Sequence, residues 1–264
     1  MALLIIIVLG IVQGLTEFLP ISSSGHLLIA GALFKAAGYP PLPDVMEVSI
    51  VLHLGTLLAI LVYYWHRVWR LLGEDRRVIG RLVAGTVPVV LVGLPLKKLA
   101  PSLLESPLLA GLLLPVTGAI LLWASRRTPG DRVYQQLGYA QAVKIGLFQA
   151  VAILPGISRS GSTIAGGLSA DLGRESAATF AFLLAIPAIA GAGVLEAAGL
   201  VQQNFTPQTP VLHLLLGAVT SFLVGLLALS WLIRWLERGH LSYFAWWCIP
   251  LGMAATGWQW WRLV

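Results

Sequence analysis

Two short polar stretches interrupt an otherwise apolar chain. The first, QGLTEFLPISSSGH at residues 13–26, brings together a carboxylate, a run of three serines and an imidazole. Ionisable groups are costly to hold in apolar surroundings, and within membranes they are functional by default. Glu17 follows Gln13 by four residues, so one helix would carry both side chains on the same face. This stretch therefore predicts a reactive site.

The second stretch, PGISRSGST at residues 155–163, repeats this plan and adds a guanidinium. Serine and glycine ahead of an apolar run are typical of a helix N-terminus, where free backbone N–H groups favour an anion. The Arg159 side chain matches phosphate oxygens with a two-pronged hydrogen-bond pattern. Together the two stretches predict a site for an oxyanion, most naturally phosphate. Its candidate binding residues are Gln13, Ser22, Ser24, Gly25, Ser158, Ser160, Gly161 and Thr163.

Glu17 is unexpected beside a phosphate site, because its negative charge would repel the ligand. A carboxylate at this position can serve as the ligand of a divalent cation that bridges it to the phosphate, or it can accept and donate protons. Either role favours hydrolysis over passive binding. Arg159 has a second interpretation as a structural partner of Glu17, which would still bring the two stretches together. Outside them, His53 is a candidate neighbour of the site, whereas Glu47 is expected to be solvated.

The composition indicates a membrane protein. The chain has 264 residues, of which 58% are hydrophobic and 11% charged, and a soluble domain of this size could not bury so much apolar surface. The formal net charge of +6 does not indicate nucleic acid, because most basic residues lie in short connections between apolar runs. Cys248 is the one cysteine, which excludes an internal disulfide and favours a packing role. The apolar N-terminus lacks the basic start of a signal peptide and is expected to remain in the mature protein.

The apolar runs predict an all-α membrane protein with one domain, residues 1–264. A crossing helix needs about 20 apolar residues. Two further runs, 1–37 and 139–170, are broken midway by proline, serine and glycine, so we expect re-entrant hairpins that return to the side they started from. The six predicted spans are residues 45–65, 82–96, 108–124, 175–199, 211–235 and 241–261.

The basic residues predict the orientation. Five arginines lie in residues 66–81, three in 125–138 and two in 234–240, which places these connections in the cytoplasm. The opposite connections, 38–44 and 201–210, contain no lysine or arginine, although Lys97 and Lys98 on that side are exceptions. Tryptophans near the C-terminus suit a membrane interface or simple packing against lipid. They are Trp246, Trp247, Trp258, Trp260 and Trp261.

The two polar stretches belong to an internal repeat. A shift of 136 positions aligns residues 10–25 with 146–161, with six identities, and a shift of 132 aligns 85–94 with 217–226, again with six. The first repeat is expected at about 1–124 and the second at about 139–264. Their hairpins start on opposite sides of the membrane, so the repeats would be inverted, an arrangement that places broken helices and their site near the midplane.

At these residues the sequence resembles the undecaprenyl-diphosphate phosphatases, the BacA/UppP-type bacitracin resistance proteins, over essentially the whole chain. The resemblance implies hydrolysis of undecaprenyl diphosphate to the monophosphate and phosphate, which recycles the lipid carrier for cell-wall synthesis and gives bacitracin resistance. It places the protein in the bacterial inner (plasma) membrane, with the site open to the periplasm or exterior, and it suggests a homodimer.

The resemblance also assigns catalytic roles. Glu17 matches the motif glutamate, Ser23 and His26 match residues implicated in phosphoryl transfer, and Arg159 matches the arginine that grips the diphosphate. Gln13 stands where some members have glutamate, which leaves one carboxylate fewer for a Mg²⁺ or Ca²⁺ ion. Attack by Ser23 and attack by water, with His26 moving the proton, both remain open.

Two other functions compete with this interpretation. The membrane acid-phosphatase signature needs a histidine and an aspartate where this chain has Ala165 and Ser169, so we discount it. A transporter or flippase of a polyprenyl phosphate lipid would share inverted repeats and broken helices. It would move the headgroup without releasing phosphate.

Overall fold

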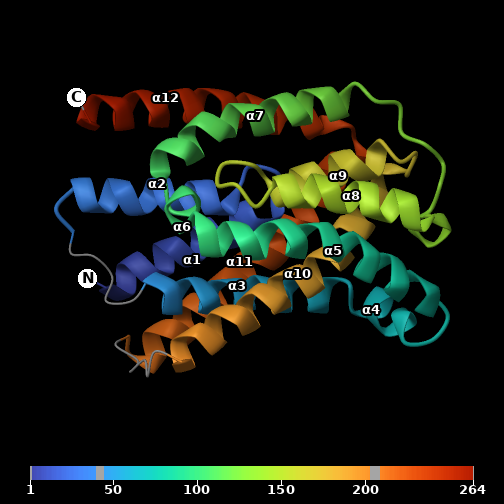
Figure 1. The fold of residues 1–264 in the computed structure, drawn as a ribbon, viewed down its shortest axis with the longest axis horizontal. Helices are drawn as coiled ribbons and strands as arrows, with labels where there is room; N and C mark the ends of the chain where they lie inside the picture. The colour runs from blue at the N-terminus through green and yellow to red at the C-terminus, as the bar shows by residue number, and fades with distance from the viewer. Residues whose placement is uncertain (1, 40–44, 203–208, 264) are drawn as a thin grey trace.

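The computed structural model describes residues 2–39, 45–202 and 209–263, and this part of the chain is helical apart from connections and an isolated bridge between Arg132 and Leu172 (Figure 1). Its α-helices are α1 (Ala2–Phe18), α2 (Ser23–Ala36), α3 (Val45–Tyr63), α4 (Trp65–Leu71), α5 (Arg76–Leu99), α6 (Pro101–Leu104), α7 (Pro107–Ser125), α8 (Tyr139–Val151), α9 (Arg159–Leu168), α10 (Arg174–Gln202), α11 (Val211–Glu237) and α12 (Ala245–Leu263). Two short 3₁₀ helices are η1 (Tyr134–Gln136) and η2 (His240–Phe244).

Five helices in the described residues are long and apolar enough to cross a membrane: α3, α5, α7, α10 and α11. They coincide with five of the six predicted spans, although α5 begins six residues earlier than predicted, at Arg76. The sixth predicted span corresponds to α12, which is not among the five. Its several tryptophans and Gln259 favour water or the membrane interface and make this helix less apolar than the others. The protein is therefore a multi-pass membrane protein.

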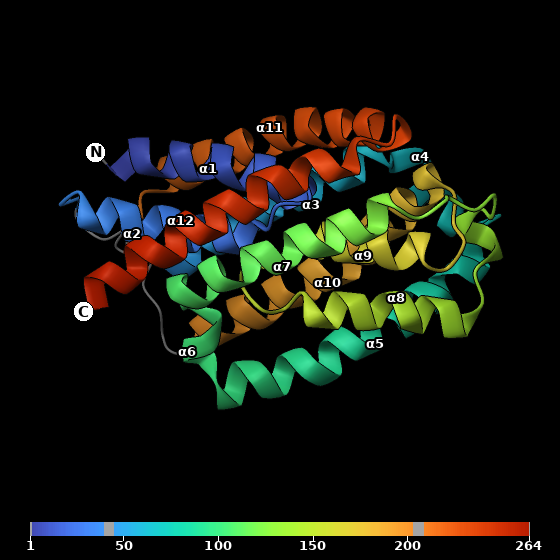
Figure 2. The same cartoon turned by 90° about the horizontal axis from the view of Figure 1, so that it is seen from above.

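The two broken segments form helical hairpins. The first hairpin consists of α1 and α2, joined by residues 19–22, and the second consists of α8 and α9, joined by residues 152–158. Pro20 and Pro155 lie in these joins, where a proline ends a helix because it lacks an N–H donor. Figure 2 shows the hairpins starting from opposite ends of the bundle and turning back in its middle. Met1 and residues 40–44, which belong to the predicted first hairpin and the following connection, lie outside the described residues.

Each hairpin packs its first helix against a long helix of the other half. A methyl group added at Gly10 in α1 would lie 3.0 Å from the backbone oxygen of Gly217 in α11. In the same way, Gly146 in α8 packs against the backbone oxygen of Gly85 in α5. These four glycines occupy corresponding places in the two sequence repeats, and the absence of a side chain lets the backbones approach closely.

The basic connections gather at one end of the bundle. Figure 2 shows α4, the end of α7 and the end of α11 at the same end. Three ion pairs are described at this end: Arg67 with Glu175 at 3.4 Å, and Arg70 with Glu74 at 3.1 Å and with Asp75 at 3.4 Å. The prediction for Glu47 was wrong: this residue was expected to be solvated, but it is only 8% exposed. It lies in the first turn of α3, close enough to the other helices to be covered by them.

Gly156, at the tip of the second hairpin, is predicted to be the glycine least tolerant of substitution. Its φ of +94° is left-handed, and an added methyl group would collide with the backbone oxygen of Ala110. The left-handed conformation alone costs about 1–2 kcal/mol for alanine. We expect Gly156→Ala to lower the apparent unfolding temperature in detergent clearly, whereas Gly31→Ala, in open space on α2, should leave it unchanged. Equal unfolding temperatures for the two variants would contradict this packing.

Candidate active site

The tips of the two hairpins contact each other directly. The backbone N–H of Gly156 donates to the hydroxyl of Ser22 at 3.1 Å, and the hydroxyl of Ser160 donates to the backbone oxygen of Leu19 at 3.4 Å. A methyl group added at Gly25 would lie 3.1 Å from the Cα atom of Gly156. Two segments that are more than 130 residues apart in sequence therefore form one structural unit.

Glu17 is the centre of this unit. Its side chain is 5% exposed. One carboxylate oxygen, Oε2, accepts hydrogen bonds from Ser23 Oγ at 2.6 Å and from Gln13 Nε2 at 3.0 Å. The other, Oε1, forms an ion pair with Nη2 of Arg159. A buried carboxylate needs such donors and a counter-charge, because its desolvation is costly. The interpretation of Arg159 as a partner of Glu17 is therefore confirmed, and this ion pair joins the two polar stretches.

His53 reaches the same carboxylate from α3. Its Nε2 atom lies 3.9 Å from Oε2 of Glu17, and its Nδ1 atom lies 2.8 Å from the backbone oxygen of Ser49. The latter contact fixes the ring with Nε2 directed at Glu17. This histidine lies in the middle of a predicted span, which is the sequence signal that made it a candidate neighbour of the site.

Both hairpins present a capped helix N-terminus at their tips. The hydroxyl of Ser22 accepts from the N–H of Gly25 at 3.3 Å, and that of Ser158 accepts from the N–H of Gly161 at 3.1 Å. These are the N-cap bonds that serine makes at the start of a helix. Ser22 has a left-handed φ of 72°, a conformation that a residue other than glycine adopts at a cost.

Thr117 was not predicted from the sequence, yet it holds the second tip in place from α7. Its hydroxyl donates to the backbone oxygen of Gly156 at 2.7 Å and accepts from the N–H of Ser158 at 2.9 Å. The side chain is 1% exposed. A single threonine in an apolar helix carries no sequence signal that separates this role from ordinary packing.

His26 lies beside the site but faces a different partner. Its Nδ1 atom is 2.8 Å from the backbone oxygen of Ser22, and its Nε2 atom accepts a hydrogen bond from the indole N–H of Trp247 at 3.0 Å. Trp247 belongs to α12 and was predicted to lie at the membrane interface or to pack against lipid, not to contact the site. In the described residues no hydrogen bond or ion pair joins His26 to Glu17.

The remaining predicted binding residues lie in three different surroundings. Ser160 and Gly161 are buried at the contact between the tips, where Ser160 Oγ also lies 3.2 Å from Ser158 Oγ. Ser24 is exposed, 3.4 Å from the hydroxyl of Ser22. The hydroxyl of Thr163 instead donates to the backbone oxygen of Arg159 at 2.8 Å, so it stabilises the helix rather than facing the other hairpin.

Few side chains near Glu17 could act as ligands of a metal ion. In the described part of the chain, no three histidine, cysteine, aspartate or glutamate side chains lie close enough to hold a metal ion. Gln13 Oε1, however, is buried without a hydrogen-bond partner, next to Glu17. One carboxylate and one amide oxygen fit a Mg²⁺ or Ca²⁺ ion whose remaining oxygen ligands would come from a bound phosphate and from water.

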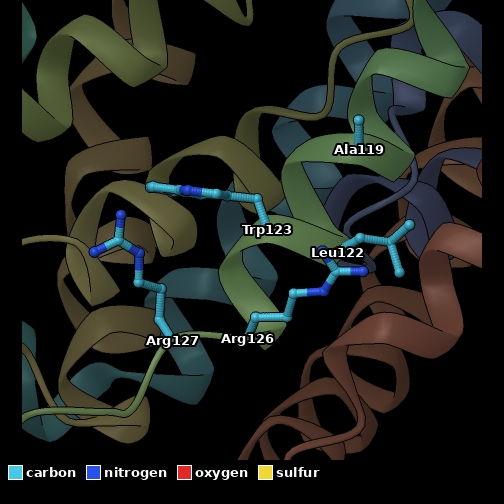
Figure 3. Close-up of a pocket in the computed structure, with 5 residues that line it drawn as sticks. All are labelled: Ala119, Leu122, Trp123, Arg126 and Arg127. Carbon is cyan, nitrogen blue, oxygen red and sulfur yellow. The ribbon is translucent and has the colours of Figure 1, made fainter.

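A separate pocket of about 340 Å³ lies where α7 ends (Figure 3). The guanidinium of Arg127 lies 4.6 Å from the ring centre of Trp123, which in turn stacks on Phe148 of α8. None of the predicted site residues lines this pocket. It is therefore distinct from the site at the hairpin tips.

Comparisons with known proteins show the family to which the chain belongs. The chain is 51% identical to an undecaprenyl-diphosphatase of Rhodopirellula baltica over 94% of its length and 95% of the relative's. It is 37% identical to an undecaprenyl-diphosphatase of Pelotomaculum thermopropionicum, with 94% and 93% covered. Residues 6–254 match the family model for the bacitracin resistance protein BacA, and that range contains every residue of the site. The chain therefore belongs to the BacA family of bacitracin resistance proteins.

Proposed function

We propose that the protein is an undecaprenyl-diphosphate phosphatase, which hydrolyses undecaprenyl diphosphate to undecaprenyl phosphate and inorganic phosphate. This recycles the lipid carrier for cell-wall synthesis and confers resistance to bacitracin. The observation that carries the proposal is the position of Glu17, which bonds Ser23 of its own hairpin and Arg159 of the other. A hydroxyl that can act as the nucleophile and a guanidinium that can bind phosphate thus lie beside one carboxylate, which can accept a proton.

The geometry favours Ser23 as the nucleophile over water. Its hydroxyl already donates to Glu17 at 2.6 Å, the arrangement of a nucleophile and its base. Arg159 and the N-terminus of α9 bind the diphosphate. The Ser23 oxygen then attacks the terminal phosphorus while its proton passes to Glu17, and the bond to the bridging oxygen breaks to release undecaprenyl phosphate. Water then attacks the phosphorus of the phosphoserine, and His26 Nε2 accepts the proton of that water. The bond between phosphorus and the Ser23 oxygen breaks, Glu17 returns its proton to that oxygen, and inorganic phosphate is released.

We further propose that Glu17 and Gln13 Oε1 hold a Mg²⁺ or Ca²⁺ ion together with oxygens of the diphosphate. Such an ion would neutralise charge on the diphosphate. Because the protein supplies only two of the oxygen ligands, we expect equilibrium dialysis with ⁴⁵Ca²⁺ to detect binding in the presence of a methylene-diphosphonate analogue of farnesyl diphosphate and little without it. EDTA should lower phosphate release accordingly. Equal calcium binding with and without the analogue would contradict this assignment.

The same proposal extends to the architecture. In it, α12 crosses the membrane as the sixth span, the two hairpins are re-entrant, and residues 1–124 and 139–264 form inverted repeats within one domain. It is supported by the opposite starting points of the hairpins and by the corresponding glycine contacts, Gly10 with Gly217 and Gly146 with Gly85. The gathered basic connections favour the cytoplasm for their end of the bundle. The site then opens to the periplasm or exterior of the inner membrane, and a homodimer stays a prediction.

Phosphate release tests the proposed activity against the transporter interpretation. Purified protein in detergent should release phosphate from undecaprenyl diphosphate, and Arg127→Ala, in the separate pocket, should release it equally fast. In sealed vesicles, movement of the lipid without release of phosphate would support a transporter or flippase instead. Folded protein that releases no phosphate would contradict the proposed function.

A further inference from the structure

His26 is held at both ring nitrogens by the protein itself. The Nδ1 atom lies 2.8 Å from the backbone oxygen of Ser22, which requires a hydrogen on Nδ1. The indole N–H of Trp247 donates to Nε2 at 3.0 Å, so the lone pair on Nε2 is occupied. These two bonds together assign the neutral tautomer with Nε2 as the acceptor.

Of the two ring nitrogens, only Nε2 can exchange a proton with a bound substrate or with water, because the hydrogen bond of Nδ1 lies within the first turn of α2. While the indole donates to Nε2, His26 cannot take a proton from water or from any other group. The hydrogen bond from Trp247 therefore has to break before His26 can act in the proposed reaction.

The side chain of Trp247 lies where it can move away from His26. Its side chain is 54% exposed on α12, and the two rings are nearly parallel with centres 6.3 Å apart. Among the described contacts, its only polar partner is His26. The neighbouring Trp246 is 68% exposed and has no described contact with His26, so it provides a matched control on the same helix.

We propose that Trp247 is a displaceable cap on His26: its indole orients the imidazole in the absence of substrate, and the incoming lipid diphosphate displaces it. Trp247 is thus a positioning residue that competes with the substrate. This inference rests on the proposed function, because it takes His26 Nε2 as the atom that moves a proton. It assigns to α12 a role in substrate binding as well as in packing.

The substitution Trp247→Phe separates the cap from a merely structural role. Phenylalanine keeps an aromatic ring beside His26 but removes the N–H donor. If the substrate competes with a hydrogen bond of ordinary net strength, its removal should lower KM about fivefold, which corresponds to about 1 kcal/mol, with kcat retained within about twofold. Trp246→Phe should change neither. An unchanged or raised KM, or a large loss of kcat, in Trp247→Phe would overturn the proposal.

A measurement independent of turnover follows the hydrogen bond itself. In protein labelled with ¹⁵N at the tryptophan indoles, one N–H resonance should be absent in Trp247→Phe and displaced in His26→Ala. Saturation with a methylene-diphosphonate analogue of farnesyl diphosphate should move the same resonance away from its hydrogen-bonded position. If bound analogue, detected by its thermal stabilisation of the protein, leaves the resonance in place, the cap is not displaced. If the analogue moves the Trp247 resonance but the wild-type protein releases no phosphate, the displacement of Trp247 is supported and the proposed phosphatase activity is refuted.

Discussion

Replacing Arg159 by alanine is expected to reduce phosphate release by about a thousandfold. Removing one preorganised donor to a reacting oxyanion costs about 10²–10³ in rate, and this arginine carries a full charge as well. Its loss also leaves Glu17 buried without its ion-pair partner, which costs about 3–5 kcal/mol when one member of such a pair is removed. The measurement is phosphate release per mole of protein that elutes as a folded species.

A more conservative change separates binding from folding. Arg159→Lys keeps the positive charge beside Glu17 but loses the planar guanidinium that grips two phosphate oxygens. We expect nearly normal thermal stability with an activity still reduced at least about tenfold. An Arg159→Ala protein that retains activity within a few fold would show that the diphosphate is held elsewhere.

Ser23→Ala is expected to reduce activity by at least about 10³-fold, because it removes the proposed nucleophile while leaving the helix N-cap at Ser22 intact. Ser230→Ala, which removes a hydroxyl that only donates to a backbone oxygen within α11, serves as the control and should retain full activity. The chemistry has a direct signature: acid quenching during turnover should trap phosphoserine on the peptide that contains Ser23. Direct attack by water would leave no phosphopeptide, and Ser23→Ala would then lose activity only through positioning.

The hairpins could be predicted closely from the sequence because their signals are local. Proline, glycine and serine inside an apolar run end one helix and cap the next, so the breaks fall at residues 19–22 and 152–158 where the motifs lie. The contact between the two hairpin tips could be predicted from a different signal. The internal repeat, together with the positions of the charged residues, indicated two inverted halves whose hairpins would share one site. The pairing of Glu17 with Arg159 could therefore be predicted from the sequence, and the structure contains this ion pair.

The contacts that the sequence did not predict come from helices remote from the motifs. Trp247 is 221 residues away from His26 in sequence, and nothing distinguishes it from its neighbour Trp246 until the packing of α12 is known. Thr117 supports the second tip for the same kind of reason. Glu47 was expected to be solvated because it lies near a span end, but such a position does not reveal how neighbouring helices cover it.

The most direct test of the central claim, that both hairpins form one hydrolytic site, compares Glu17→Gln, Arg159→Gln and the double variant in phosphate release from undecaprenyl diphosphate. Residues that act as one unit are strongly non-additive. If each single change costs about 10³-fold, the account predicts that the double variant keeps a measurable residual rate close to that of the single variants. Losses that multiply to about 10⁶-fold would show that Glu17 and Arg159 act independently and would contradict a shared site.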